Sequence, residues 1–327
     1  MLRVLFGGGA VVLAVVGFYV VAQASPDYWK YEWPRTDFTK SAVDFEDILS
    51  GGPPKDGIPS IDNPIFVTVA EAKGLADTEP VVGLVIGKEA RAYPLQILMW
   101  HEIVNDVVAG VPVAVTFCPL CNAAVVFDRR LDGQVLEFGT TGKLRNSDLV
   151  MYDRQSESWW QQFTGEAIVG ELLGKKLTFV PSRLESFANF KKRAPDGKVQ
   201  VPNSPGMRRY GANPYAGYDS STRPFLYRGQ MPANVPPLSR VVSIDGRAWS
   251  LSLLREKRRI ETADGLIITW EPGQNSALDA RTIDAGTDVG NVVAQRKTAS
   301  GLEDVVYGVD FAFAFHAFYP DAEIATK

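Results

Sequence analysis

The residues with the most distinctive chemistry in this chain are its two cysteines, Cys118 and Cys121, which are separated only by Pro119 and Leu120. Thiolates bind soft and borderline metal ions, and two thiols can also be oxidised to a disulfide. At this spacing the two sulfurs can converge on one metal ion or on each other. The first question is therefore whether the pair binds a metal, forms a disulfide or does neither.

The residues around the pair indicate β-strands on both sides of it. An apolar, β-prone run leads in, and the residues after Cys121 predict a hairpin that turns at Asp132-Gly133. In a thioredoxin-like protein a helix follows the cysteines and lowers the pKa of a thiol, and no such helix is predicted here. We therefore expect a knuckle between strands, similar to the Cys-Pro-x-Cys metal knuckle of rubredoxins and zinc ribbons. Those sites take four ligands, so the missing ones would have to come from other residue types or from solvent.

The first 24 residues have the pattern of a secretory signal peptide, with Arg3, an apolar run over residues 4–21, and Ala22-Gln-Ala24 as a cleavage signal. The length of the apolar run leaves an uncleaved N-terminal anchor as the alternative. In both cases we expect an extracytoplasmic protein, periplasmic or secreted, with membrane attachment only through residues 1–24. Disulfides persist in that compartment.

The charge balance argues against two classes of partner. Of the 34 lysines and arginines, Arg3 leaves with the signal, so 33 remain against 38 acidic residues and the formal charge is −5. A net negative charge does not favour nucleic acid or an anionic membrane surface as a partner. We therefore expect no nucleic-acid partner.

An internal repeat organises most of the chain. Arg91-Ala-Tyr matches Arg247-Ala-Trp at an offset of 156, and Thr116-Phe-Cys-Pro matches Thr269-Trp-Glu-Pro at an offset of 153. Each copy predicts a hairpin, a short helix and a second hairpin. We therefore predict an α+β, β-rich fold in which two pseudo-repeated hairpin–short helix–hairpin halves share a core, with an insertion between them.

These patterns divide the chain into three parts. Residues 1–24 form the signal peptide or anchor, and residues 25–64 form an irregular segment with a short helix near 42–49. A single β-rich domain covers residues 65–327, with the repeats at about 81–140 and 238–297.

Comparison of the two copies separates the scaffold from the chemistry. The second copy has Glu271, Gln274 and Lys257 where the first has Cys118, Cys121 and His101. Since the frame is kept without the three first-copy residues, we predict that these three are metal ligands. The alternative for His101 is a structural role at the end of the short helix, where a basic side chain is favourable.

Four residues of the insertion are candidates for a cofactor pocket beside the cysteines: Arg145, Asp148, Asp153 and Trp160. The alternative is that they form loop ion pairs and aromatic contacts in the core.

Three further segments have patterns of secondary structure. Residues 176–180 predict a strand, and Ser182-Arg-Leu-Glu185 predicts the capping box of a helix that extends to about Lys191. Residues 311–318 alternate with period two and predict a strand. His316 lies on one face of it, where we expect a packed and hydrogen-bonded side chain rather than a ligand.

Several motifs together resemble the family of bacterial and archaeal proteins catalogued as domain of unknown function 3179. These motifs are Arg91-Ala-Tyr-Pro-Leu, Trp100-His-Glu-Ile-Val-Asn-Asp106, Thr116-Phe-Cys-Pro-Leu-Cys-Asn122, Leu144-Arg-Asn-Ser-Asp-Leu-Val-Met-Tyr-Asp153 and Trp160-Gln-Gln-Phe-Thr-Gly-Glu-Ala167. The resemblance implies an exported protein, and the family's histidine and cysteine pair match His101, Cys118 and Cys121. A histidine at position 316 is not part of the family's pattern. The resemblance implies no activity.

Three functional classes remain open, and whether the protein is an enzyme is not decided. The first is a metal-binding protein with a site of two cysteines and one histidine, in copper handling or redox chemistry, with copper favoured over zinc. The second is a thiol–disulfide oxidoreductase whose partner is a small-molecule or protein thiol. The third is a binding module without enzymatic activity, in which Cys118 and Cys121 form a structural disulfide.

Overall fold

The computed structural model describes residues 26–327, so the predicted signal peptide or anchor lies outside the described part. Among the described residues, none of the helices combines the length and the hydropathy that crossing a lipid bilayer requires. The α-helices have seven residues each, and strands, short 3-10 helices and loops form the rest of the described chain, so the protein is β-rich as predicted. The helices are α1 (Pro26–Glu32), α2 (Leu95–His101), α3 (Phe187–Arg193), α4 (Leu251–Lys257) and α5 (Ala312–Phe318).

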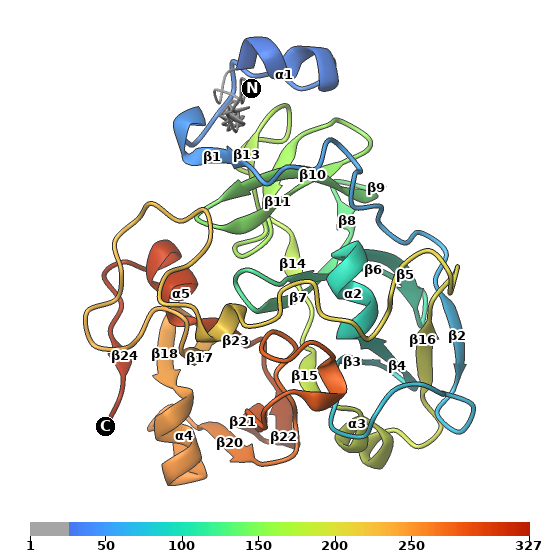
Figure 1. Ribbon diagram of the computed structural model, residues 1–327, viewed down its shortest axis with the longest axis vertical. Helices are drawn as coiled ribbons and strands as arrows, with labels where there is room; N and C mark the ends of the chain where they lie inside the picture. The colour runs from blue at the N-terminus through green and yellow to red at the C-terminus, as the bar shows by residue number, and fades with distance from the viewer. Residues whose placement is uncertain (1–25) are drawn as a thin grey trace, which may run out of the picture.

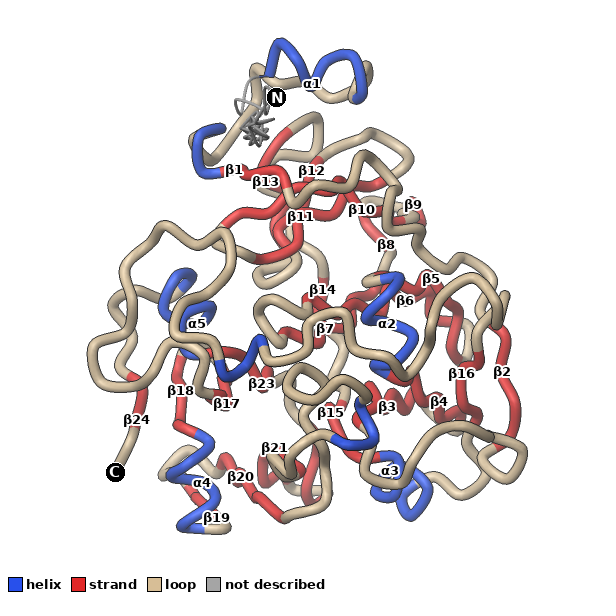
Figure 2. The backbone as a smooth tube through the Cα atoms, viewed as in Figure 1, coloured by secondary structure: helices blue, strands red, loops and turns tan. Residues whose placement is uncertain are grey.

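Within residues 26–327, five β-sheets of four or five strands form a ring, like the blades of a propeller (Figures 1 and 2). The first sheet contains β1 (Ile48–Ser50), β10 (Phe138–Arg145), β11 (Asp148–Asp153), β12 (Trp159–Gln161) and β13 (Glu166–Val169). The second contains β14 (Thr178–Phe179), β7 (Ala123–Asp128), β6 (Val111–Cys118) and β5 (Ile103–Val108). The third contains β15 (Arg183–Ser186), β3 (Pro80–Ile86), β4 (Glu89–Pro94), β16 (Lys198–Val201) and β2 (Ile65–Thr68).

The remaining sheets come mostly from the C-terminal part of the chain. The fourth contains β23 (Gly308–Phe311), β17 (Arg240–Ile244), β18 (Arg247–Ser250) and β24 (Ile324–Ala325). The fifth contains β19 (Arg259–Glu261), β20 (Leu266–Glu271), β21 (Asn291–Thr298) and β22 (Gly301–Asp304). A small ribbon of β8 (Arg130–Leu131) and β9 (Gln134–Val135) turns at Asp132-Gly133, as predicted, and both turn residues have the positive φ of a two-residue hairpin turn.

Two segments of the chain follow the same path through the ring. The hairpin β3–β4 leads into α2 and then into β5–β6, and the hairpin β17–β18 leads into α4 and then into β19–β20. Both helices end at a residue with positive φ, Glu102 at 57° and Arg258 at 62°, where the chain turns into the next sheet.

The predicted strand at residues 311–318 is wrong. Phe311 ends β23, and the following residues form the helix α5 with His316 in its last turn. Ala312, Phe313, Ala314 and Phe315 are all fully buried. Because the first four residues of this short helix are buried on all sides, its sequence does not carry the 3.6-residue period of a surface helix.

The predicted capping box lies one turn too early. Residues 183–186 form the strand β15, and α3 begins at Phe187 with Ser186 as its N-cap. The Ser186 hydroxyl accepts a hydrogen bond from the Asn189 amide at 3.3 Å. The cap chemistry is the expected one, since a serine oxygen satisfies a free amide of the first turn.

The segment at residues 25–64 is more ordered than predicted. It contains α1, and β1 adds to the first sheet with Ile48 opposite Arg145. Trp29 and Trp33 of this segment pack edge-on or tilted against Trp159, with ring centroids 5.0 and 5.4 Å from it. The segment is therefore part of the folded body.

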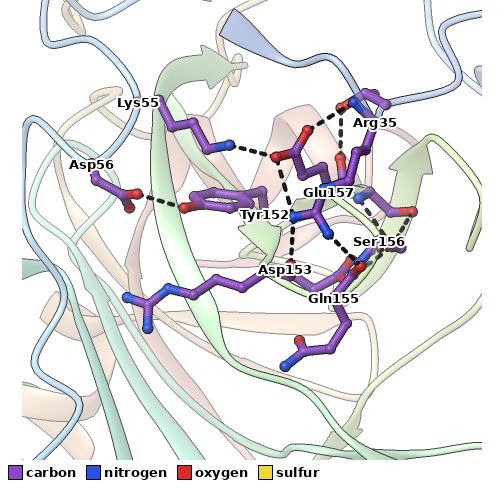
Figure 3. Close-up of polar contacts among 11 residues, drawn as sticks. Arg35, Lys55, Asp56, Tyr152, Asp153, Gln155, Ser156 and Glu157 are labelled. Carbon is purple, nitrogen blue, oxygen red and sulfur yellow. Dashed lines mark hydrogen bonds and ion pairs between the residues drawn. The ribbon is translucent and has the colours of Figure 1, made fainter.

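Ion pairs and hydrogen bonds also hold this segment against the first sheet (Figure 3). The buried carboxylate of Glu157 accepts hydrogen bonds from the Arg35 amide at 3.0 Å and from the Lys55 ammonium at 2.8 Å. The Lys55 ammonium also lies 4.3 Å from the centre of the Trp33 ring. The aromatic contacts and the charged contacts thus fix the same stretch of chain.

Replacement of Ser250 by alanine is expected to lower the free energy of unfolding by about 1 kcal/mol, because Ser250 is the N-cap of α4. Its buried hydroxyl accepts from the Leu253 amide at 3.2 Å. Urea unfolding measures the change. Ser250→Thr keeps the acceptor and is the control, and an equal loss in both variants would contradict the capping role.

Candidate metal centre

Cys118 and Cys121 lie in a tight loop between two adjacent antiparallel strands. Cys118 ends β6 and pairs with Ala123, the first residue of β7. Within the loop the Cys121 amide donates to the Cys118 carbonyl at 3.3 Å, and Asn122 has a φ of 53°. This is the predicted knuckle between strands.

The knuckle is fastened to β23 in the fourth sheet. The Asn122 side-chain amide donates to the Val309 carbonyl at 2.6 Å, and the Phe311 amide donates to the Cys121 carbonyl at 2.9 Å. These two hydrogen bonds fix the backbone of the knuckle at Cys121 and Asn122.

The third residue of the site is Asp148, the first residue of β11. It follows a two-residue turn, Asn146-Ser147, in which both residues have positive φ. The Cys118 thiol lies 3.7 Å from the Ser147 carbonyl, to which it donates. One carboxylate oxygen of Asp148 and the sulfurs of Cys118 and Cys121 all lie within 4.8 Å of one another, and all three residues are buried.

Two hydrogen bonds orient the Asp148 carboxylate. Its Oδ2 accepts from the Gln161 side-chain amide at 2.7 Å and from the Phe163 backbone amide at 2.9 Å. Its Oδ1 is buried and has no hydrogen-bond partner. A buried oxygen without a partner is costly, so Oδ1 is available to a ligand that would bind in this group.

The electrostatics of the group also favour a cation. Burial raises the pKa of the Cys118 thiol, raises that of Cys121 well above its usual range, and raises the pKa of Asp148 to about 7. Among the ion pairs of residues 26–327, none includes Asp148. A metal ion would supply the missing positive charge, because metal binding favours the deprotonated ligands.

A cavity of about 520 Å³ is lined by residues that neighbour the three ligand residues in the chain. Leu120, between the cysteines, and Leu149, next to Asp148, both line it. Tyr215, Tyr218 and Glu102 also line it. Its size is within the range of small-molecule sites.

Glu102 is the unusual residue of this cavity. It is 8% exposed, and burial, followed by the charge of Asp148, raises its pKa to about 8. A carboxyl group with such a pKa can give or take a proton near neutral pH. Our sequence analysis did not single out Glu102, although this residue lies in the motif Trp100-His-Glu-Ile-Val-Asn-Asp106, directly before β5.

The structure does not bring His101 into this group of three. Its Nδ1 lies 2.7 Å from the Pro59 carbonyl oxygen, and its Nε2 lies 2.9 Å from the Tyr210 hydroxyl. Both ring nitrogens therefore have protein partners. In this position His101 joins the end of α2 to two loops.

The four candidates of the insertion separate into two sets. Asp148 reaches the sulfurs, and Arg145 is joined to it through Gln161, whose side-chain oxygen accepts from the Arg145 guanidinium at 3.3 Å. Asp153 instead accepts from the Trp160 indole at 3.0 Å and from Ser156, in the loop drawn in Figure 3. Asp153 and Trp160 thus form a hydrogen bond with each other, which agrees with the alternative that they have a structural role.

Comparison with protein families supports the resemblance that the motifs suggested. A family model described as "Protein of unknown function (DUF3179)" matches residues 55–322. The matched range includes Cys118, Cys121, Asp148 and Glu102. Comparison with the curated proteins and with the solved structures finds no match.

Proposed function

The chain belongs to the DUF3179 family, and from its geometry we propose that it is a metal-binding protein with Cys118, Cys121 and Asp148 as ligands. The observation that carries the proposal is the buried cluster of three ligand atoms in which Asp148 Oδ1 has no partner. Burying ionisable groups without a counter-charge is unfavourable, and a bound cation removes that cost.

Zinc is the metal that this ligand set favours. Two thiolates and a carboxylate, with solvent in a fourth position, suit the tetrahedral geometry of Zn²⁺. The sequence analysis favoured copper for a ligand set of Cys118, Cys121 and His101. A carboxylate is a harder ligand than imidazole and shifts the preference away from Cu(I). Cu(I) is the second candidate, because the two thiolates alone suit it.

Glu102 is the residue that we assign to proton transfer beside the metal. It lines the cavity that adjoins the ligand loop, and its raised pKa supports a role as general acid or base for a molecule bound there. The apolar run at residues 4–21 supports an extracytoplasmic location for this site.

Thiol–disulfide exchange is less well supported than metal binding. Cys118 and Cys121 are free thiols and are 2% and 0% exposed. Burial raises the pKa of both thiols, which lowers the fraction of reactive thiolate. A protein partner would have no direct access to either sulfur.

We also propose that the two halves of the ring are copies of one unit. The pairing of Val81 with Pro94 corresponds to that of Val241 with Ser250, so the hairpin β3–β4 is four residues longer than β17–β18. The offset is therefore 160 between β3 and β17, and 156 between β4 and β18, where Arg91-Ala-Tyr matches Arg247-Ala-Trp. In this alignment Glu271 occupies the position of Cys118 and Gln274 that of Cys121, so only the first copy has the two cysteines, and Asp148 belongs to the insertion.

The metal content of single variants tests the proposed site. The mature protein, reduced and loaded with zinc, is expected to bind one ion per chain, measured by mass spectrometry of the metal after gel filtration. Cys118→Ser, Cys121→Ser and Asp148→Asn are expected to lose it. Gln161→Leu, which removes the hydrogen bond to Asp148, is expected to weaken zinc binding about 10–100-fold.

His101→Ala is the matched control and is expected to keep the metal, since both of its ring nitrogens have other partners. If His101→Ala loses zinc and Asp148→Asn keeps it, the ligands are Cys118, Cys121 and His101, and our assignment of Asp148 is wrong. Copper retained in preference to zinc would decide for the second candidate metal. A wild-type protein that binds neither metal but traps mixed disulfides in one cysteine variant would decide for redox chemistry.

A further inference from the structure

We propose that a second cavity, which Asp310 helps to line, binds a small organic cation with an aromatic body, such as an arylalkylamine. The cavity has a volume of about 320 Å³ and lies between β7 of the second sheet and β17 and β23 of the fourth. It contains none of the three proposed metal ligands. The inference therefore does not depend on the metal site.

Asp310 is a buried carboxylate without a cationic partner. It is 2% exposed, and its Oδ2 accepts a hydrogen bond from the Ser243 hydroxyl at 2.5 Å. Among the ion pairs of the described residues, none includes Asp310. A methyl group on Gly308 would lie 2.3 and 2.7 Å from the two carboxylate oxygens, so this position must be glycine for the carboxylate to fit.

The corresponding position in the first half of the chain has a cationic partner, which Asp310 lacks. Glu185 lies opposite Val81 in the pair β15–β3, as Asp310 lies opposite Val241 in the pair β23–β17. Glu185 forms an ion pair with Arg193, the last residue of α3. A seven-residue helix follows each of these strands directly: α3 follows β15, and α5 follows β23. In the first half, the last residue of that helix is the arginine that pairs with the buried acid.

The second half has no such arginine. Phe318 is the last residue of α5 and corresponds to Arg193, because both helices begin directly after the strand and have seven residues. Its ring stacks on Phe163 with the centroids 4.7 Å apart, and Phe163 lines the cavity. Where the first half has an internal cation, the second half has an aromatic ring beside an open cavity.

The rest of the cavity wall fits a cation with an aromatic body. Phe163, Phe179, Tyr307 and Tyr319 line it, and no lysine or arginine does. Its other charged residue, Asp245, forms an ion pair with Arg296 at 3.2 Å. A buried carboxylate without a counter-ion selects a positive charge, and aromatic faces add a cation–π attraction. The volume is at the lower end of the range for small-molecule sites.

Titration calorimetry with 2-phenylethylamine tests the proposal. The wild-type protein is expected to bind one molecule of the amine per chain. Its affinity for the neutral analogue 2-phenylethanol is expected to be at least about 10 times lower. Asp310→Asn is expected to lower the affinity for the amine at least about 10-fold, while leaving the zinc content unchanged. Asp245→Asn, which removes the other carboxylate of the wall, is the matched control and is expected to change the affinity less than about threefold.

A second variant covers the case in which Asp310→Asn does not fold. Phe318→Arg supplies the arginine of the first half, which is expected to pair with Asp310 and abolish binding of the amine. Equal affinities for the amine and the alcohol, no binding of the amine to the wild-type protein, or unchanged binding in Phe318→Arg would each overturn the proposal.

Discussion

The metal-free protein is expected to lose stability as the pH rises from about 4.5 to about 8, which is the opposite of ordinary acid denaturation. Burial raises the pKa of Glu102 from 4.5 to about 8, and the pKa values of Glu79 and Asp310 to about 7. Between the unfolded and folded pKa values the native state binds more protons than the unfolded chain, so the free energy of unfolding falls with rising pH. For Glu102 alone the loss is about 5 kcal/mol.

Urea unfolding of the metal-free protein at pH 5, 6.5 and 8 measures this slope. Glu102→Gln removes the titrating group and is expected to flatten the dependence. Glu256→Gln, at an exposed position of α4, is the control and is expected to leave it unchanged. A free energy of unfolding that rises between pH 5 and pH 8 would show that these carboxyl groups are not buried as described.

Zinc is expected to reverse the sign of this dependence. The ligands must lose protons to bind the metal, so the affinity for zinc, and with it the stability of the loaded protein, rises with pH. The same three unfolding experiments in the presence of zinc therefore separate the metal site from the other buried acids.

Replacement of Trp33 by alanine is expected to lower the free energy of unfolding by about 4 kcal/mol, because a large and fully buried ring is removed. Trp33 is 0% exposed and lies between Tyr152 and Trp159, with ring centroids 4.7 and 5.4 Å away. It also contacts the Lys55 ammonium. Chemical denaturation measures the loss.

Tyr31, two residues earlier, is the matched control. It is 90% exposed, and Tyr31→Ala is expected to change the stability by less than about 0.5 kcal/mol. Hydrogen exchange adds a local measurement, because the Ala42 amide donates to the Ile168 carbonyl at 2.9 Å. Equal stability of the two variants would mean that the segment before β2 does not contribute to the folded body.

The sequence predicted the cysteine loop well because local signals define it. The turn at Asp132-Gly133, the apolar strands and the proline between the cysteines all act over a few residues. The partner of the two sulfurs was harder to identify, since Asp148 reaches them only through the packing of the first sheet against the second. Comparison of the two copies selected His101 because of its residue type. Such a comparison does not show how far the His101 ring lies from the two sulfurs.

The helix α5 and the order of the segment at residues 25–64 were missed for a related reason. Phe311, Phe313 and Phe315 are buried on every side, and such a segment has no solvent face to reveal whether it is a helix or a strand. Trp29 and Trp33 occur among polar residues, prolines and glycines, a composition typical of loops. Their partners Tyr152 and Trp159 lie more than 100 residues further along the chain, beyond the range of any local pattern.

A single backbone hydrogen bond connects the proposed metal site with the proposed cation site. The Cys121 carbonyl accepts a hydrogen bond from the Phe311 amide, and Phe311 directly follows Asp310. If occupancy of either site shifts this contact, the two affinities are linked, and thermodynamic reciprocity requires the factor to be the same in both directions. An organic cation would then alter the retention of the metal, and the metal would alter the retention of the cation by the same factor.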